Sequence, residues 1–121
     1  VIGHFDLPRL FSEGAPELES TEVKSAVGTV LERAKSAGTI LDLNVGALGK
    51  ELATPYPAPW IVRLADDIGV PFCFGDDSHS ILKVGANIEA GRDYLLGLKV
   101  ETITKLKREN GTIIKEIVPL R

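Results

Sequence analysis

Short apolar segments alternate with amphipathic helical segments through the middle of this chain, and this alternation constrains the fold more than any other feature. Residues 39–43 (TILDL) and 70–74 (VPFCF) have the length and composition of buried strands. Residues 21–36 and 58–68 carry apolar side chains at helical spacing. Strands that alternate with helices pair in parallel, because each helix returns the chain to the same end of the sheet. The sequence therefore predicts an α/β fold.

The two ends of the chain add further elements. Residues 1–3 (VIG) are typical of the end of another strand, and a third helical pattern covers 87–96. A Gly- and Pro-rich loop is expected over 45–59. Residues 100–107 and 112–118 flank Asn110-Gly111, and both turn residues tolerate positive φ. The sequence therefore predicts a C-terminal β-hairpin.

Polar side chains follow each of the three apolar strands. His4 follows the first, Asn44 the second, and Asp77 and His79 the third. Function gathers at the carboxyl ends of parallel strands. We therefore expect these side chains to meet in one site.

The Asp77-Ser78-His79 segment has the residue types of a metal site. Residues two apart in an extended backbone project to the same side, and imidazole and carboxylate ligands suit zinc, iron or manganese. His4 can join them from a neighbouring strand end. The alternative is a surface turn in which an aspartate caps the following helix, and that capping role is the one expected of Asp76.

Other polar residues allow two interpretations each. Arg9 and Lys50 can bind an anion or lie on the surface in solvent, and Asp6 can orient a ligand or its own loop. Cys73 lies between two phenylalanines, so a buried thiol is expected there rather than a nucleophile.

Composition excludes some function classes. The net charge is −3 without a block of basic residues, which argues against nucleic acid or a membrane surface as partner. No apolar run approaches the roughly 18 residues of a membrane span. The single cysteine excludes an internal disulfide and favours a reducing, cytoplasmic location. The chain has no Met and begins with Val, so we expect a fragment or a processed product.

Four motifs occur in a fixed order along the chain: 3–7 (GHFDL), 41–44 (LDLN), 55–59 (PYPAP) and 75–79 (GDDSH). This ordered set resembles the histidinol-phosphatases of the PHP (polymerase and histidinol phosphatase) family. Residues 76–79, with Val84-Gly85 after them, are most similar to the fungal branch. The resemblance runs from residue 1 to about residue 107.

The resemblance implies a distorted (βα)7 barrel with a trinuclear centre of divalent zinc, manganese or iron. It implies hydrolysis of a small phosphorylated substrate, L-histidinol phosphate, in histidine biosynthesis. Carried over residue by residue, it makes His4, Asp77 and His79 metal ligands, with Asp77 and His79 at the catalytic centre. Arg9, Asn44 and Lys50 are then expected at the substrate, with Arg9 as the main phosphate ligand and Lys50 as a weaker helper.

The chain departs from the family pattern in two ways. The early His-x-His pair and further Glu and His ligands of the family are absent, and Gly49 stands where the family usually has arginine. We therefore expect residues 1–121 to be the C-terminal part of one PHP domain, inactive alone and completed by its missing N-terminal part or by a second copy. The exact substrate stays open.

Alternatives are a different PHP phosphoesterase, a polymerase PHP nuclease, and a degenerate barrel used for assembly. The acidic charge balance argues against the nuclease.

Overall fold

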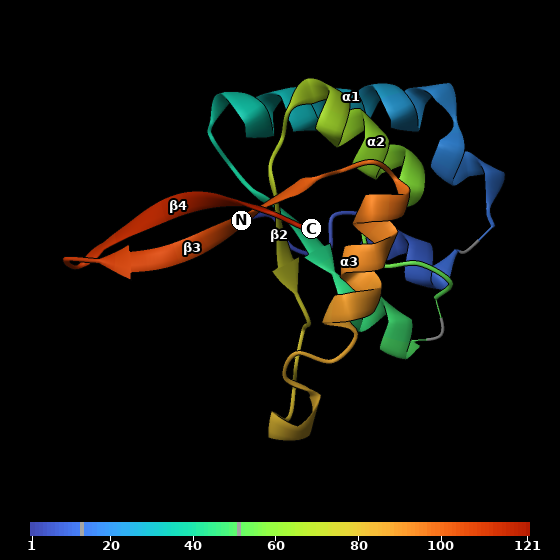
Figure 1. Cartoon of the computed structure of the whole chain (residues 1–121). Helices are drawn as coiled ribbons and strands as arrows, with labels where there is room; N and C mark the ends of the chain where they lie inside the picture. The colour runs from blue at the N-terminus through green and yellow to red at the C-terminus, as the bar shows by residue number, and fades with distance from the viewer. Residues whose placement is uncertain (13, 51) are drawn as a thin grey trace.

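Two short parallel strands form the centre of the fold. The computed structural model describes residues 1–12, 14–50 and 52–121. In it β1 (Leu41–Asn44) pairs in parallel with β2 (Phe72–Gly75), and Ile2 makes a parallel bridge to Leu41 from the other side of β1 (Figure 1). The predicted parallel arrangement is confirmed. The first segment, however, contributes a single bridge rather than a strand, because His4 has a φ of 49° and turns the backbone away from the sheet.

In the described residues three α-helices pack around this sheet. They are α1 (Thr21–Ser36), α2 (Pro59–Ile68) and α3 (Ile88–Gly97), each within one residue of its predicted start and end. The Oγ of Ser20 accepts a hydrogen bond from the Val23 backbone N–H and caps α1. Gly69, at a φ of 84°, ends α2 in the left-handed conformation common after helices. Local sequence therefore sets these boundaries.

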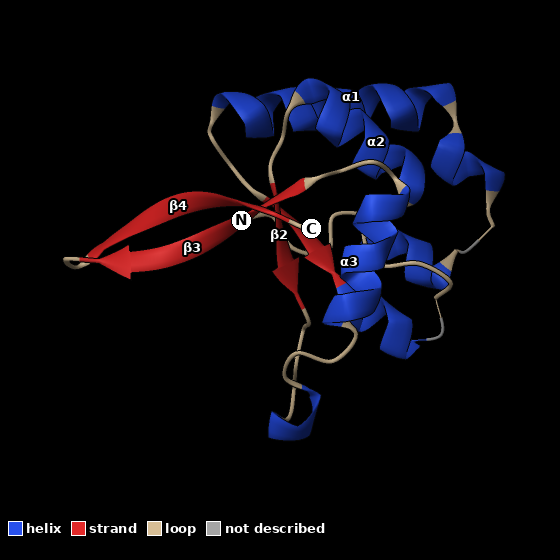
Figure 2. Ribbon diagram, in the orientation of Figure 1, coloured by secondary structure: helices blue, strands red, loops and turns tan. Residues whose placement is uncertain are grey.

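The hydrophobic core lies between the helices and the two strands (Figure 2). α1 and α2 pack against one another beside the sheet, and α3 approaches the end of β1 through Gly91. Burying these side chains from water is the main favourable contribution to the fold. The largest fully buried apolar side chains belong to Leu31, Ile40, Leu41, Leu43, Tyr56, Val62, Phe72 and Leu95.

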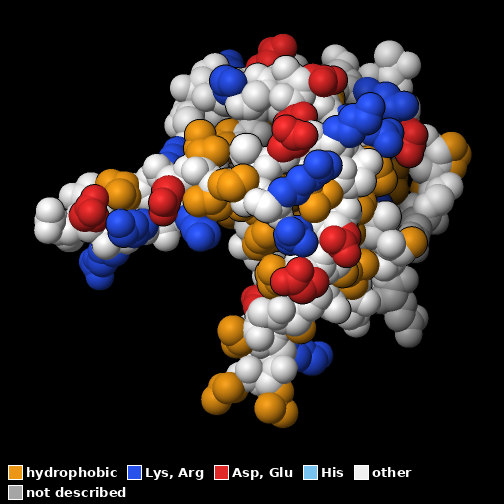
Figure 3. Space-filling view, viewed as in Figure 1, with side chains coloured by type: hydrophobic (Ala, Val, Ile, Leu, Met, Phe, Trp, Pro, Cys, Tyr) orange, Lys and Arg blue, Asp and Glu red, His pale blue; other side chains and the backbone are white. Residues whose placement is uncertain are grey.

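The described parts of the connections contain four short 3-10 helices. They are η1 (Leu7–Phe11), η2 (Pro16–Glu19), η3 (Val45–Lys50) and η4 (Ile81–Lys83). The predicted loop over 45–59 was therefore partly wrong, since its first half is helical. The η4 segment projects from the body, and Figure 3 shows hydrophobic side chains on this projection, where Ile81, Leu82 and Val84 are exposed.

The C-terminal hairpin is confirmed. β3 (Thr102–Glu109) and β4 (Thr112–Pro119) pair antiparallel. Asn110 and Gly111 form the turn, with φ values of 49° and 81°. The hairpin extends away from the rest of the molecule (Figure 2). Each sheet in the described part of the chain has two strands, so the barrel stays a prediction.

No helix among residues 1–12, 14–50 and 52–121 combines the length and the hydropathy needed to cross a membrane.

The packing of α3 gives the first prediction. A β-carbon at Gly91 would lie 2.5 Å from Val45 Cγ1 and 3.3 Å from Phe74 Cε1. Gly91→Ala should therefore lower the free energy of unfolding by about 1–3 kcal/mol, although alanine favours helix by about 1 kcal/mol. Urea unfolding measures this. The control is Gly97→Ala in the same helix, where nothing lies within 4 Å. Equal stability of the two variants would contradict the packing described.

Candidate active site

A contact between the His4 imidazole and the Asp77 carboxylate joins the ends of the first and third apolar segments. The His4 Nε2 lies 3.1 Å from the Asp77 Oδ2. Both residues have positive φ, 49° and 50°, in the left-handed region that residues other than glycine rarely adopt. Such backbone strain persists where the surrounding structure enforces it, and it clusters at functional sites. The two strained residues of this pair are therefore the centre of the candidate site.

Lys50 brings a positive charge to the same carboxylate. Its Nζ lies 3.0 Å from the Asp77 Oδ2, at the end of η3. The hydrogen bond from Lys50, together with His4, holds the pKa of Asp77 below its usual range. Asp77 is therefore ionised at neutral pH, as a metal ligand must be.

Asn44 lies at the carboxyl end of β1 with its amide held at both ends. Its Oδ1 accepts a hydrogen bond from the Gly46 backbone N–H at 3.0 Å, and its Nδ2 donates to the Asp42 Oδ2 at 2.9 Å. The same nitrogen lies 3.4 Å from the His4 Nε2. The structure thus brings Asn44 together with His4, Asp77 and Lys50.

Asp42 is a site residue that sequence reasoning did not select. It is buried in β1, and burial raises the pKa of its carboxyl above the usual range. Its place two residues before Asn44 puts both side chains on one face of the strand. That spacing could have identified Asp42 as a site residue, but the surrounding apolar segment has the pattern of an ordinary buried strand.

His79 follows Asp77 in an exposed segment. Its Nδ1–H donates to the Asp77 backbone carbonyl at 2.6 Å. In neutral imidazole this bond favours the tautomer with the proton on Nδ1 and the lone pair on Nε2. A metal ion that binds Nε2 requires that tautomer. The role of His79 as a ligand stays a prediction.

The donor types fit a divalent transition metal, since imidazole nitrogen and carboxylate oxygen suit zinc, manganese and iron. His4 and Asp77 supply one of each within 3.1 Å. Outside positions 13 and 51, however, the chain holds no group of three or more His, Cys, Asp or Glu side chains arranged for a metal ion. Metal binding by this chain therefore stays a prediction.

Asp76 does not cap the following helix as expected, since the N-cap residue of η4 is Ser80 and makes no side-chain cap bond. Its Oδ1 accepts from the Ser78 backbone N–H at 3.2 Å, and its Oδ2 accepts from the Gly85 backbone N–H at 2.5 Å. The bond from Gly85 lowers the pKa of Asp76. The carboxylate therefore closes the loop that carries η4.

Arg9 is not a solvated surface group. Its NH1 donates to the Thr54 Oγ1, and its NH2 donates to the carbonyl oxygens of Thr54 and Pro55, at 2.5 to 3.2 Å. Its side chain is 13% exposed and pairs with the Asp6 Oδ2 at 3.2 Å. These bonds tie the segment after His4 to the loop before α2.

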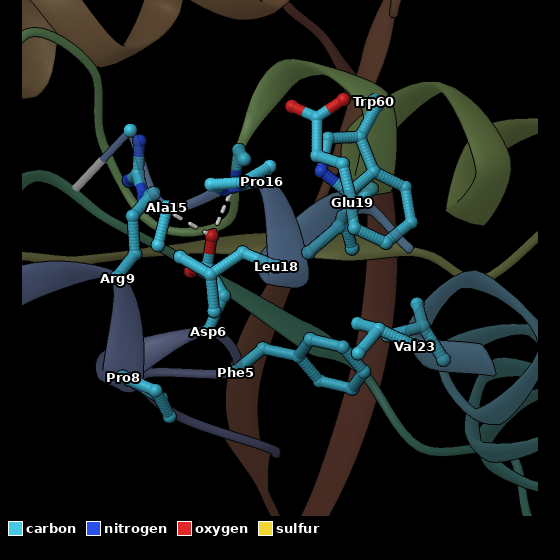
Figure 4. A pocket seen from close by; sticks show the side chains of 14 residues that line it. Phe5, Asp6, Pro8, Arg9, Ala15, Pro16, Leu18, Glu19, Val23 and Trp60 are labelled. Atoms are coloured by element: carbon cyan, nitrogen blue, oxygen red, sulfur yellow. Dashed lines mark hydrogen bonds and ion pairs between the residues drawn. The ribbon is translucent and has the colours of Figure 1, made fainter. Parts of the chain in front are cut away.

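Asp6 completes this connection, because its Oδ2 also accepts from the Ala58 backbone N–H at 2.7 Å. Asp6 and Arg9 lie together at the edge of a cavity of about 530 Å³ that Trp60 also lines (Figure 4). Asp6 therefore orients its own loop, one of the two roles that the sequence allows for it.

Cys73 is partly buried in β2, and burial raises the pKa of its thiol to about 11. The thiol is protonated at neutral pH, which agrees with the expectation that it is not a nucleophile.

Comparison with known proteins confirms the resemblance to histidinol-phosphatases. A probable histidinol-phosphatase of Schizosaccharomyces pombe is 32% identical across 97% of this chain and 40% of its own length. One of Deinococcus radiodurans is 37% identical across 69% of this chain and 30% of its own length. The histidinol-phosphatase of Saccharomyces cerevisiae is 29% identical across 92% of this chain and 40% of its own length.

The chain therefore spans about two fifths of the fungal relatives that it matches. No family model matches the chain.

The Lys50–Asp77 contact gives the second prediction. Because Lys50 lowers the pKa of Asp77, Lys50→Met should raise it toward the value of an unpaired aspartate. A carboxyl titration followed by carbon-13 NMR measures this pKa. Lys107→Met is the control, since its ammonium pairs with Glu109 on the hairpin. An Asp77 pKa that is the same in wild type and Lys50→Met would show that the contact does not form in solution.

Proposed function

We propose that the complete protein containing this chain is a metal-dependent phosphatase that hydrolyses L-histidinol phosphate to L-histidinol and phosphate. The observation that carries the proposal is the 32% identity to a probable histidinol-phosphatase along 97% of this chain. The cluster of His4, Asn44, Lys50 and Asp77 at the strand ends supports it, because the cluster combines metal-ligand types with a phosphate-binding cation.

The fold belongs to the proposal as well. We propose that residues 1–121 form the C-terminal part of a distorted (βα)7 barrel of the PHP type. The parallel pair β1–β2 with crossover helices supports this. The rest of the barrel, with the remaining metal ligands, would come from other parts of the protein or from a second copy.

We propose His4, Asp77 and His79 as the ligands that this chain contributes to divalent zinc, manganese or iron. When bound, such ions neutralise charge on the phosphoryl oxygens and lower the pKa of a nearby water molecule. Asp77 and His79 would then stand at the reacting phosphate. The alternative role, a non-catalytic unit for assembly, is favoured by the lack of a three-ligand group in the described residues.

We propose Lys50 and Asn44 as the side chains that bind the phosphate. The Lys50 ammonium lies beside Asp77, and the Asn44 amide nitrogen lies beside His4. Arg9, in contrast, uses its guanidinium for Thr54, Pro55 and Asp6. It would have to open these bonds to reach a phosphate, so we assign the larger share of phosphate binding to Lys50.

The third prediction tests the activity itself. The complete protein with added manganese or zinc should release phosphate from L-histidinol phosphate, at a turnover of about 1 per second or faster. The 121-residue chain alone should not, because the three proposed ligands His4, Asp77 and His79 cannot hold three metal ions by themselves. Phosphate release is measured for both, with serine phosphate as a substrate control. Equal turnover of the two proteins would overturn the incomplete-site proposal, and a complete protein without turnover would overturn the assigned reaction.

The fourth prediction separates Lys50 from Arg9. In the complete protein Lys50→Ala should remove a charge-assisted hydrogen bond of about 1.5–3 kcal/mol and lower kcat/KM by roughly ten- to a hundred-fold. Arg9→Ala should mainly lower the free energy of unfolding, since it leaves the Thr54 and Pro55 carbonyls unpaired. Kinetics at saturating metal and urea unfolding measure the two effects. The reverse pattern would make Arg9 the phosphate ligand.

A further inference from the structure

Asp42 is a buried carboxylate at the base of the candidate site. It is 7% exposed, and its Oδ1 has no hydrogen-bond partner among the residues that the structure describes. A buried charge with an unpaired oxygen opposes folding. An apolar residue would serve the strand better if packing alone decided this position.

The neighbouring backbone leaves room for this carboxylate. A β-carbon at Gly75, on the adjacent strand β2, would collide with the Asp42 Oδ1 and lie 2.8 Å from its carboxyl carbon. On the other side, a β-carbon at Gly3 would lie 3.6 Å from the Oδ2. Gly75 on one side of β1 and Gly3 on the other thus leave space for the Asp42 carboxylate.

The Oδ2 of Asp42 fixes the orientation of the Asn44 amide. It accepts from the Asn44 Nδ2 at 2.9 Å, while the Asn44 Oδ1 accepts from the Gly46 N–H at 3.0 Å. A carboxylate only accepts and an N–H only donates, so the two bonds assign the amide nitrogen and oxygen without ambiguity. The nitrogen is thereby kept on the side of His4, 3.4 Å from its Nε2.

We propose that Asp42 is a positioning residue that acts through Asn44. It keeps the amide nitrogen, a donor, turned toward the place where a phosphate oxygen would bind beside His4. Without Asp42 only the bond from the Gly46 N–H holds the amide, and when that bond opens the amide can rotate by half a turn and present its oxygen, which repels a phosphate. This inference rests on the proposed phosphatase function, since it assigns Asn44 to the phosphate.

Two substitutions at Asp42 separate positioning from packing. Asp42→Ala removes the acceptor and should lower kcat/KM of the complete protein roughly ten- to a hundred-fold, with no loss of stability because a buried charge is removed. Asp42→Asn keeps an acceptor oxygen on a side chain of the same shape, so its kcat/KM should be close to the wild-type value. In the double variant with Asn44→Ala the Asp42→Ala effect should largely disappear, because both changes act on one contact.

Gly75→Ala tests the same contact without changing a polar group. Its methyl group should displace the Asp42 carboxylate and lower kcat/KM in the same direction. Gly28→Ala on α1, where a β-carbon meets nothing within 4 Å, is the matched control and should leave kcat/KM unchanged.

Proton exchange of the Asn44 side-chain amide, followed by NMR, provides a readout that does not depend on activity. In wild type this exchange should be slow, and in Asp42→Ala it should be at least ten-fold faster. Unchanged exchange would overturn the positioning role, and so would faster exchange with unchanged kcat/KM. A wild-type protein with slow exchange but no turnover would instead place the failure with the proposed phosphatase function.

Discussion

Parallel hydrogen bonding between β1 and β2 is the constraint on which the site depends. It sets Asn44 opposite Gly75, so the segments that follow the two strands start side by side at one edge of the sheet. Gly46 lets them approach closely, because a β-carbon there would lie 2.9 Å from the Asp76 carbonyl oxygen and 3.0 Å from the Asp77 Cβ. Lys50 can reach Asp77 across 27 residues of sequence only because of this register.

The site concentrates features that oppose folding. His4 and Asp77 have strained backbone angles, and such angles cost on the order of 1–3 kcal/mol each. Asp42 adds a buried carboxyl whose pKa is raised by loss of hydration. The apolar core, which includes Leu41 and Phe72, stabilises the folded chain enough to keep these groups in place. Their energetic cost is the physical reason to look for chemistry at this edge rather than elsewhere.

The sequence predicted the elements well because their signals are local. Helical spacing located α1, α2 and α3, and Asn110-Gly111 located the hairpin. It also predicted that His4, Asn44, Asp77 and His79 would meet at one edge; contacts join the first three, and the place of His79 in the site stays a prediction. It did not predict Asp42, because one acidic residue in an apolar strand becomes informative only when its partner is known. The bonds from Arg9 to Thr54 and Pro55 join positions about 45 apart, and no local pattern encodes such contacts.

Those distant bonds distinguish the Arg9 side chain from that of Lys50. The loop before α2 is held from two sides: Arg9 binds its carbonyl oxygens, and Tyr56 makes an antiparallel bridge with Asn44. The Tyr56 ring also lies against both His4 and Arg9, with centroid distances of 5.9 and 5.4 Å. Groups that share partners in this way stabilise one another cooperatively. A guanidinium fixed in such a network is suited to holding His4 and Asn44 in register, whereas the more exposed ammonium of Lys50 would have to open only its contact with Asp77 to bind a phosphate oxygen in the proposed reaction.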